Sequence, residues 1–249
     1  MHAVKISLIT VTYNAESTIS RCIESVIAQK YPNLEYIIID GGSTDNTLQI
    51  ISRYKDNINI LITEPDHGIY DAMNKGIRMA SGNVTGTLNA DDFFASDDIL
   101  ANVAATFENT RADIVYGDLD YINSDETIRR KWRTRAYKSG SYNWGWMPPH
   151  PTFYCKTGLF EKYGYYSLEH GTAADYELML RFMHRNNAKA AYLNKVMIKM
   201  QCGGLSNKNP TNRVKAGRFD LRAMRSNGVL HPLIALILKP LRKIGQYLS

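Results

Sequence analysis

Cysteines are few in this chain, and long apolar runs are missing. The 249 residues include three cysteines, Cys22, Cys155 and Cys202, and their positions do not have the spacing of metal ligands. A sparse, odd set of cysteines argues against a disulfide framework and fits a reducing compartment. No run approaches the roughly 18 apolar residues that a membrane-spanning helix needs, and the amino-terminal residues carry no signal-peptide pattern. We therefore expect a cytoplasmic protein without a membrane span.

Acidic residues are almost missing from the last part of the chain. Residues 206–249 contain nine Lys and Arg residues and one acid, Asp220, whereas the whole chain has a net charge of +6. The first 205 residues are therefore slightly acidic, and the basic character belongs to a tail. A basic segment indicates a polyanionic partner. We expect a membrane surface and no nucleic acid, because the chain contains no recognised nucleic-acid motif.

The tail combines apolar and basic residues. Residues 229–248 read VLHPLIALILKPLRKIGQYL, which is too interrupted to span a bilayer. The pattern predicts a basic amphipathic helix that lies on an anionic membrane surface. Packing of this helix on its own domain, or on the partner in a homodimer, remains an alternative. We expect a main domain over residues 1–205 and a basic amphipathic helical tail over 206–249.

Apolar runs alternate with helical patterns in the first ninety residues. Because these runs are continuous, they indicate strands that are buried on both faces of a sheet. The alternation predicts an α/β fold with a doubly wound, mostly parallel sheet. The predicted strands cover residues 4–11, 34–39, 58–62 and 84–88, and the predicted helices cover 15–29, 44–54 and 70–80.

The second half of the sequence is less regular. We expect an aromatic, proline-rich loop beside a strand at residues 142–154. Further predicted strands cover 114–120, 127–133 and 190–200, and predicted helices cover 97–108, part of 171–185, 213–226 and 231–248.

Polar residues follow each of the first four predicted strands. In open α/β sheets, ligands bind outside the carboxyl ends of the strands. Four such clusters on one edge therefore predict a binding site there. The clusters are Thr12-Tyr13-Asn14, Asp40-Gly41-Gly42-Ser43, Glu64-Pro65-Asp66 and Asn89-Ala90-Asp91-Asp92.

Two adjacent acids end the fourth of these clusters. The ionised carboxylates of Asp91 and Asp92 repel each other, and a divalent cation is the usual remedy. Carboxylate oxygens suit Mg²⁺ or Mn²⁺, which typically bind one or two carboxylates together with substrate phosphates. The pair predicts a metal–diphosphate site, with a simple turn or helix cap as the alternative.

The acids of the second and third clusters have two interpretations. Asp40 either caps a turn or binds a nucleobase or ribose. Asp66 either caps the helix that follows or belongs to the site. Asp71 and Asn74 are three residues apart and share one face of that helix. We expect this face to point toward the strand ends, so that both residues belong to the binding site.

Candidate residues for chemistry also lie in the second half. Asp175, near the start of a predicted helix, is a candidate general base, with Glu177 as its competitor. The alternative is an acid that only stabilises the helix amino terminus. Trp144, Trp146 and His150 are candidates for contact with a sugar acceptor, and a core or solvated-loop position is the alternative for each.

Four segments together resemble the family-2 inverting glycosyltransferases of the GT-A nucleotide-diphospho-sugar transferase fold. The segments are TVTYN at residues 10–14, IIIDGGSTDNT at 37–47, TEPDHGIYDAMNKGI at 63–77 and LNADD at 88–92. The resemblance covers residues 4–200 and is most similar to the bacterial branch that builds O-antigen, capsule and colanic-acid polysaccharides. It implies a nucleotide-sugar donor, usually UDP-linked, a divalent metal, Mn²⁺ or Mg²⁺, and direct displacement with inversion.

The resemblance also implies roles for individual residues. Thr12, Tyr13 and Asn14 fall where the family lines the base pocket, and Asp40 falls where it binds the base. Asp66 falls in the donor site, and we expect Asp71, Asn74, Asn89 and Ala90 to bind the donor as well. Asp91 matches the acid that holds the metal and the diphosphate, and Asp175 matches the catalytic base.

Two positions depart from the family pattern. Asn89 stands where an acid is usual, which predicts a weaker metal site, and Ala174 precedes Asp175 where Glu is usual. The Gln-x-x-Arg-Trp motif and the membrane spans of the processive synthases are missing, so we expect one sugar to be added per encounter.

The sequence therefore predicts a cytoplasmic glycosyltransferase at the inner face of the membrane, with a lipid-linked saccharide acceptor. A non-catalytic nucleotide-sugar or glycan-binding module is the alternative from another class. A nucleotidyltransferase is less favoured, because Thr12-Tyr13-Asn14 replaces its Gly-rich basic signature.

Overall fold

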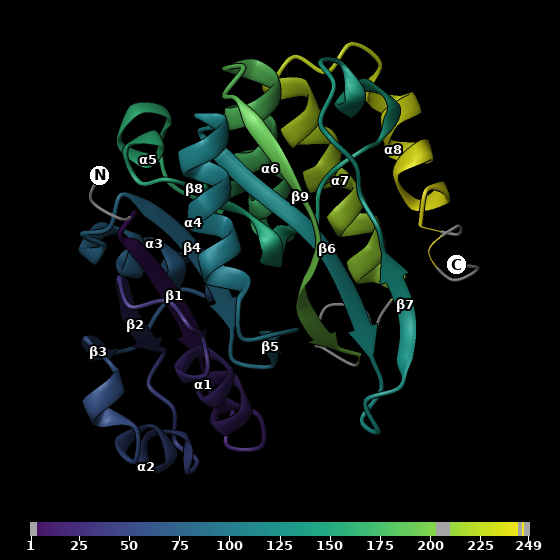
Figure 1. The fold of residues 1–249 in the computed structure, drawn as a ribbon. Coiled ribbons are helices and arrows are strands. Elements are labelled where there is room, and N and C mark those ends of the chain that lie inside the picture. The colour runs from purple at the N-terminus through teal and green to yellow at the C-terminus, as the bar shows by residue number, and fades with distance from the viewer. Residues whose placement is uncertain (1–3, 203–209, 244–245, 247–249) are drawn as a thin grey trace.

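A single curled sheet runs through the computed structural model, which describes residues 4–202, 210–243 and 246 (Figure 1). The strand order is β3-β2-β1-β4-β8-β6-β9-β5, and β7 pairs with β6 beside this path. The strands are β1 (Ile6–Thr12), β2 (Leu34–Asp40), β3 (Ile60–Thr63), β4 (Val84–Asn89), β5 (Asp92–Phe94), β6 (Ile114–Ile122), β7 (Ile128–Trp132), β8 (Tyr154–Lys156) and β9 (Ala190–Gln201).

Most of the neighbouring long strands are parallel. β1 pairs in parallel with β2 and β4, β2 with β3, and β6 with β9, whereas short β8 joins β4 to β6 in antiparallel pairing. This arrangement confirms the prediction of a doubly wound, mostly parallel α/β sheet.

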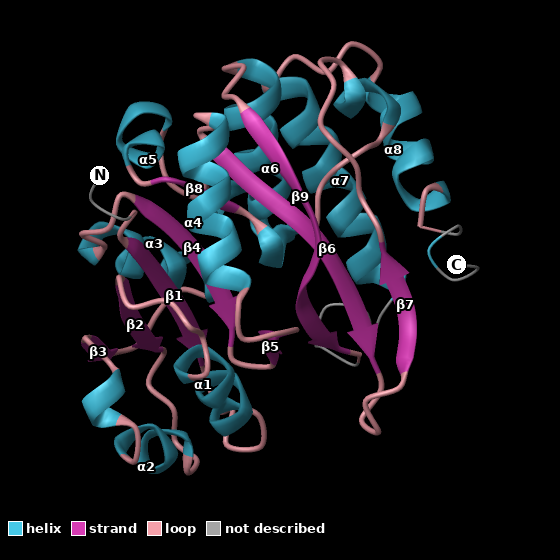
Figure 2. Ribbon diagram, viewed as in Figure 1, coloured by secondary structure: helices cyan, strands magenta, loops and turns pink. Residues whose placement is uncertain are grey.

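Helices cover both faces of the sheet (Figure 2). Leu8 of β1 packs in a cluster with residues of α1, α2 and α4, whereas Ile9 packs in a second cluster with residues of α3, α6 and α7. Adjacent residues of a buried strand thus enter two separate cores. The helices are α1 (Ile19–Ile27), α2 (Thr47–Ser52), α3 (Ile69–Met79), α4 (Ile99–Thr110), α5 (Gly158–Tyr163), α6 (Ala174–Met179), α7 (Pro210–Ser226) and α8 (Pro232–Leu241).

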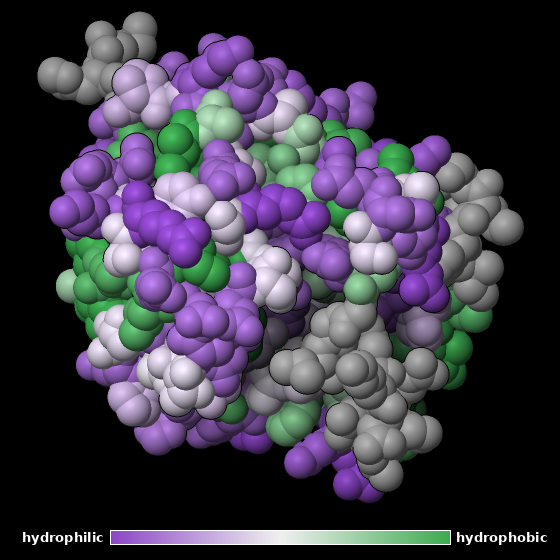
Figure 3. Space-filling model, turned by 90° about the horizontal axis from the view of Figure 1, so that it is seen from below, coloured by the Kyte–Doolittle hydropathy of each residue, from purple (hydrophilic) through white to green (hydrophobic). Residues whose placement is uncertain are grey.

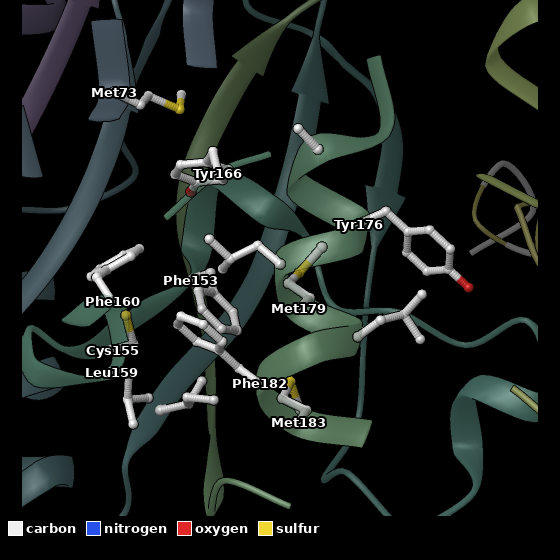
Figure 4. Close-up of a cluster of buried hydrophobic side chains, with 14 of the residues drawn as sticks. Met73, Phe153, Cys155, Leu159, Phe160, Tyr166, Tyr176, Met179, Phe182 and Met183 are labelled. Atoms are coloured by element: carbon white, nitrogen blue, oxygen red, sulfur yellow. The ribbon is translucent and has the colours of Figure 1, made fainter. Parts of the chain in front are cut away.

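Aromatic residues fill the second cluster beside α6. Phe153, Phe160 and Phe182 meet there, and the Phe160 and Phe182 ring centroids lie 5.6 Å apart in edge-to-face geometry (Figure 4). Edge-to-face contact places the positive edge of one ring on the negative face of the other. The cluster holds α6 against the sheet.

Short elements are the ones that the sequence did not predict. Strand β5 and helix α5 were not expected, and the expected strand beside the proline-rich loop is the three-residue β8. Three residues are too few to show an alternating pattern, because pairing with neighbours rather than periodicity defines such strands. Residues 180–185 also continue α6 as a π-helical segment.

The basic tail contains α7 and α8, and both pack on the rest of the chain. Ala223 and Met224 of α7 are buried, as is Ala235 of α8. Gly145 allows α8 to approach closely: its φ is +72°, and a Cβ there would lie 2.6 Å from the Lys239 nitrogen. The predicted boundary at 205 and 206 lies outside the described residues, as do residues 244–245 and 247–248 of the predicted last helix.

A buried ion pair joins α6 to the loop after α5. Arg181 donates to both carboxylate oxygens of Glu177, the shorter contact being 2.8 Å, and also to the carbonyls of Tyr163, Gly164 and Tyr165. The Glu177 carboxylate also accepts a bond from Asn227, just after α7. One guanidinium therefore fixes a loop and a helix, while its partner reaches α7.

Substitution of Arg181 by Gln should lower the free energy of unfolding by about 3–5 kcal/mol, because it leaves a buried carboxylate and three carbonyls without their donor. Urea unfolding followed by circular dichroism measures this. Arg222→Gln is the matched control, since its pair with Glu169 is solvent-exposed and should contribute less than about 1 kcal/mol. Equal losses in the two variants would contradict the proposed role of burial.

Candidate active site

The polar clusters after the first four strands lie side by side. The strand registers pair Thr12 with Asp40, Asp40 with Thr63, and Val11 with Asn89. The strands therefore end within one residue of each other on one edge of the sheet. Figure 3 looks onto this edge from below, where hydrophilic residues cover much of the surface.

Asp40 shapes the turn that follows β2. The side chain is fully buried, and its carboxylate accepts hydrogen bonds from the Gly42 and Ser43 backbone nitrogens at 3.1 and 3.0 Å and from the Ser43 hydroxyl. This is the turn-capping geometry that the sequence left open as an alternative. Any contribution to ligand binding acts through the turn that Asp40 holds.

The loop after β1 is tied to the same turn. The Asn14 backbone nitrogen donates to the Ser43 hydroxyl, and the Asn14 side-chain oxygen accepts from the Thr44 nitrogen, both at 2.8 Å. Thr12 is buried, whereas the Tyr13 ring is 64% exposed. An exposed ring on a fixed loop offers a stacking surface for a planar ligand.

Asp66 approaches the Asp40 turn from the third cluster. One carboxylate oxygen accepts a bond from the Gly68 nitrogen at 2.8 Å, and the other contacts the position that a Cβ on Gly41 would occupy. That Cβ would also lie 3.5 Å from the Tyr13 ring. The lack of a side chain at Gly41 therefore leaves room for the Asp66 carboxylate on the side of this turn near Tyr13.

Asp71 and Asn74 of α3 form hydrogen bonds within the protein. Asp71 accepts a bond from the His67 nitrogen at 3.0 Å. The buried Asn74 amide donates to the Tyr166 carbonyl and accepts from the Tyr166 nitrogen, both at 2.9 Å. With its donor and its acceptor both used, Asn74 positions the chain at Tyr166.

Asn89, Ala90, Asp91 and Asp92 form the turn from β4 to β5. The Asn89 amide donates to one oxygen of the buried Asp92 at 3.1 Å, while Asn89 Oδ1 and Asp92 Oδ1 are buried without a partner. Burial raises the pKa of Asp92 well above its usual range, and the charge of Asp91 raises it further. Burial also raises the pKa of Asp91, against a lowering from its own backbone and from Arg21.

These oxygens fit a hard divalent cation. Two crowded carboxylates with raised pKa values gain from a positive ion, and the unpartnered oxygens match the ligand type of Mg²⁺ or Mn²⁺. The described residues contain no group of three or more His, Cys, Asp and Glu side chains that is arranged to hold a metal. The fit is therefore to an ion that takes its remaining ligands from a bound phosphate group.

Asp175 lies among aromatic residues from three segments. Its carboxylate is 4.0 Å from His150 Nδ1, and His150 Nε2 lies 3.3 Å from the Tyr166 hydroxyl. Tyr70 of α3 stacks on Tyr166, with ring centroids 5.4 Å apart, and its hydroxyl lies near the Asp175 carboxylate. Burial raises the pKa of the Tyr70 hydroxyl, and the Asp175 charge raises it further, so Tyr70 keeps its proton beside the carboxylate.

The Asp175 group is connected to the end of β4. Burial raises the pKa of the Tyr166 hydroxyl, and nearby Thr87, two residues before Asn89 on that strand, partly offsets this. The competing acid, Glu177, is 5% exposed and bound to Arg181. Asp175 keeps partial exposure, with 21% of its side chain accessible, so it is the acid of this pair that can reach a ligand.

The three candidate acceptor residues separate in the structure. His150 lies beside Asp175, as described. Trp144 is 54% exposed, whereas Trp146 is buried among Tyr116, Tyr137 and Tyr142. Trp146 therefore takes the core position that the sequence left open.

The sequence does not reveal Tyr166 or the position of Tyr70 beside Asp175. Tyr70 lies in the predicted helix over residues 70–80 without an assigned role, and Tyr166 lies in no motif. No local pattern relates Tyr70, Tyr166 and Asp175, because the segments that carry them are far apart in the chain. The one sequence feature that could have indicated this cluster is the run of aromatic residues around His150. Large aromatic side chains need large partners in order to be buried.

Comparison with known proteins gives consistent matches. The model of the family described as Glycosyl transferase family 2 matches residues 7–166. A PGL/p-HBAD biosynthesis glycosyltransferase of Mycobacterium bovis is 30% identical over 223 residues, which cover 83% of this chain and 81% of the relative. The Escherichia coli protein WfgD, a UDP-Glc:alpha-D-GlcNAc-diphosphoundecaprenol beta-1,3-glucosyltransferase, is 32% identical over 124 residues, 49% of each chain.

Solved structures share the fold. Staphylococcus aureus TarS superimposes with a TM-score of 0.70 and 21% identity, over 90% of this chain and 39% of TarS. TarS 1–349 in complex with UDP-GlcNAc gives 0.70 and 19%, over 97% and 73% of the two chains. The mannosyltransferase PcManGT from Pyrobaculum calidifontis, in complex with GDP-Man and Mn²⁺, gives 0.68 and 17%, over 96% and 73%.

The contact of His150 with Asp175 can be tested by titration. Burial lowers the pKa of His150, and the Asp175 charge partly offsets this. In Asp175→Asn the pKa of His150 should fall further, because the offsetting charge is removed. Ring signals in heteronuclear NMR between pH 4.5 and 8.5 measure this, with His170 as the control. A His150 pKa that stays unchanged or rises would show that the two groups do not interact.

Proposed function

The chain belongs to glycosyl transferase family 2, and we propose that it moves one sugar from a nucleotide-diphospho-sugar, a UDP-sugar, to a hydroxyl of a lipid-linked saccharide in cell-surface polysaccharide synthesis. The observation that carries the proposal is the link, through Tyr166 and Thr87, between Asp175 and the edge where the donor clusters end. A base and a donor must meet within hydrogen-bond reach of one acceptor hydroxyl. The UDP-GlcNAc complex of TarS and the diphosphoundecaprenol-linked acceptor of WfgD support this donor and acceptor class.

The nucleoside end of the donor fits the first three clusters. The exposed Tyr13 ring stacks on the base, while Asp66 faces it across Gly41. Asp40, Thr12 and Asn14 contribute by holding the loops, through the hydrogen bonds of the Asp40 turn and the ties of Asn14 to Ser43 and Thr44. These residues bind and orient the donor and take no part in the bond changes.

The diphosphate end of the donor fits the turn after β4. Asp91, together with Asn89 and Asp92, would hold Mn²⁺ or Mg²⁺, which when bound supplies positive charge to the diphosphate as the nucleotide leaves. The amide of Asn89 in place of an acid keeps Asp92 hydrogen-bonded. It also leaves one charge fewer in the site, so we expect a weaker metal affinity than an acid would give.

Asp175 accepts the proton of the acceptor hydroxyl, and the hydroxyl oxygen attacks the anomeric carbon opposite the leaving diphosphate. Direct displacement inverts that carbon. Tyr70 lies beside the Asp175 carboxylate and supports its orientation, and neutral His150 lies 4.0 Å from that carboxylate. The exposed Trp144 is the acceptor-side residue that can stack on a sugar.

Helix α8 offers a surface for the membrane that carries such an acceptor. Its exposed apolar residues repeat at helical spacing on one face and are 46–63% exposed, and Leu230, just before the helix, is 73% exposed. Within the part of the chain that the structure describes, no helix is both long and apolar enough to cross a bilayer. We infer peripheral binding to the inner face of the cytoplasmic membrane. The apolar face of α8 consists of Leu233, Ile234, Ile237 and Leu241, and Leu230 adjoins it.

The donor site is tested by binding and slow hydrolysis of a panel of nucleotide sugars with Mn²⁺, Mg²⁺ or EDTA. Wild type should turn over one donor in the presence of metal, and Asp91→Ala should lose this activity. Asp175→Asn should bind the donor normally but transfer sugar about 10²- to 10⁴-fold more slowly, because it lacks a general base. Asp125→Asn, in an exposed turn, is the control.

Two results would contradict the proposal. If no nucleotide sugar binds, the donor assignment fails. If a donor binds but no turnover occurs with any lipid-linked acceptor, the non-catalytic module of the same fold becomes the better description. Near-normal transfer by Asp175→Asn would remove the base assignment alone.

Membrane binding is tested by sedimentation with vesicles that contain phosphatidylglycerol. The double variant Leu233→Gln/Ile237→Gln should bind at least tenfold more weakly, because each buried aliphatic side chain contributes about 1.5–3 kcal/mol. Leu61→Gln/Ile128→Gln is the matched control, since both residues are exposed apolar positions away from α8. Equal loss in the control, or a wild-type dimer that the α8 variant dissociates, would contradict the membrane assignment.

A further inference from the structure

A basic pocket lies between β7 and α8, outside the residues assigned to the donor. Its cavity measures about 310 Å³, and its walls come from β7, residues 133–135 and 145–147, and α8 with the residues that follow it. In Figure 1 the chain leads from β7 to the turn beside α8. Six basic residues line it: Lys131, Arg133, Arg135, Lys239, Arg242 and Lys243.

Half of these cations have partners within the protein. Arg133 pairs with Asp120 at 2.6 Å, and Lys239 pairs with Asp220 at 2.8 Å. Arg242 donates its Nε–H to the Trp144 carbonyl at 2.7 Å. These contacts fix three positive groups in place around the cavity.

The other three, Lys131, Arg135 and Lys243, form no ion pair with a carboxylate in the part of the chain that the structure describes. Burial lowers the pKa of Lys243, and the nearby charges of Lys239 and Arg130 lower it further. Cations gathered in a cavity without matching acids gain free energy when an anion binds.

The pocket lies next to the proposed catalytic base. The Lys239 ammonium is 3.6 Å from the centroid of the Tyr176 ring, and Tyr176 follows Asp175 in α6. The Asp175 charge also acts on Lys243. On α8 itself, helical geometry puts Lys239 about 180° around the axis from the exposed apolar face.

We propose that this pocket binds the diphosphate of the lipid-linked acceptor. The inference rests on the proposed function, since it assigns the acceptor side of the same reaction. A lipid-linked saccharide carries its groups in the order lipid, diphosphate, sugar. The protein presents the matching order: the apolar face of α8, the basic pocket, and Asp175. The donor diphosphate is assigned to the turn after β4, which contributes no wall of this pocket.

Pocket binding is tested by isothermal titration calorimetry with inorganic pyrophosphate and with geranyl diphosphate, in EDTA. Wild type should bind both, and Lys131→Gln/Arg135→Gln/Lys243→Gln should bind both at least tenfold more weakly. Affinity should fall with added NaCl, as expected for charge pairing. The matched control removes three exposed cations outside the pocket, Arg53→Gln/Lys55→Gln/Lys138→Gln, and should bind as wild type. Circular dichroism and the thermal midpoint verify that both variants fold.

Competition distinguishes this pocket from the donor site. Saturating UDP should not displace either ligand, and Asp91→Ala should bind both normally. Displacement by UDP would assign the anion to the donor site and overturn the proposal, as would equal weakening in the control variant. Binding of pyrophosphate without geranyl diphosphate would exclude the acceptor. If the wild-type protein binds both ligands but turns over no nucleotide sugar, the assignment of the pocket stands and the proposed function is refuted.

Discussion

The buried pair of Arg181 and Glu177 holds together the half of the molecule that carries the proposed base. Its guanidinium satisfies three consecutive backbone carbonyls that would otherwise be buried without donors. Glu177 and Arg181 follow Asp175 by two and six residues in the chain, so the loop that the pair fixes and the helix that carries Asp175 cannot move independently. Burying two charges costs desolvation free energy. Here the hydrogen bonds to Glu177 and Arg181 offset that cost, as a buried ion pair requires in order to be stable.

That loop carries Tyr166, and Tyr166 connects the two halves of the site. Asn74 of α3 binds its backbone, Thr87 of β4 lies near its hydroxyl, and His150 of the proline-rich segment contacts that hydroxyl. The contacts from α3 and β4 join donor-side elements to the acceptor side. Asp175 is therefore held by packing around Tyr166, with Tyr70 beside its carboxylate. A base that sits in such a framework keeps one orientation before any ligand arrives, which lowers the cost of reaching the reactive geometry.

The donor edge could be predicted from the sequence because parallel strands impose it. Once four buried strands alternate with helices, their carboxyl ends must meet at one edge, and Thr12, Asp40 and Asn89 meet there without further information. Asp175 came from a resemblance, and its surroundings could not be predicted. Tyr70 and His150 reach it from remote segments, and only tertiary packing decides which aromatic residue is core, as Trp146 is, and which is exposed, as Trp144 is.

Tertiary packing also explains why the basic residues are concentrated in the last part of the chain. The basic tail looked in the sequence like a separate surface segment, yet Gly145 lets α8 pack directly on the turn between the two tryptophans. This packing turns one side of the helix toward Arg133, Arg135 and the cations of β7, and leaves the aliphatic side in solvent. Cations that only bound a membrane would gain most from lying beside the apolar face. Their position around a cavity next to Tyr176 instead favours an anion of defined size, bound close to where the base acts.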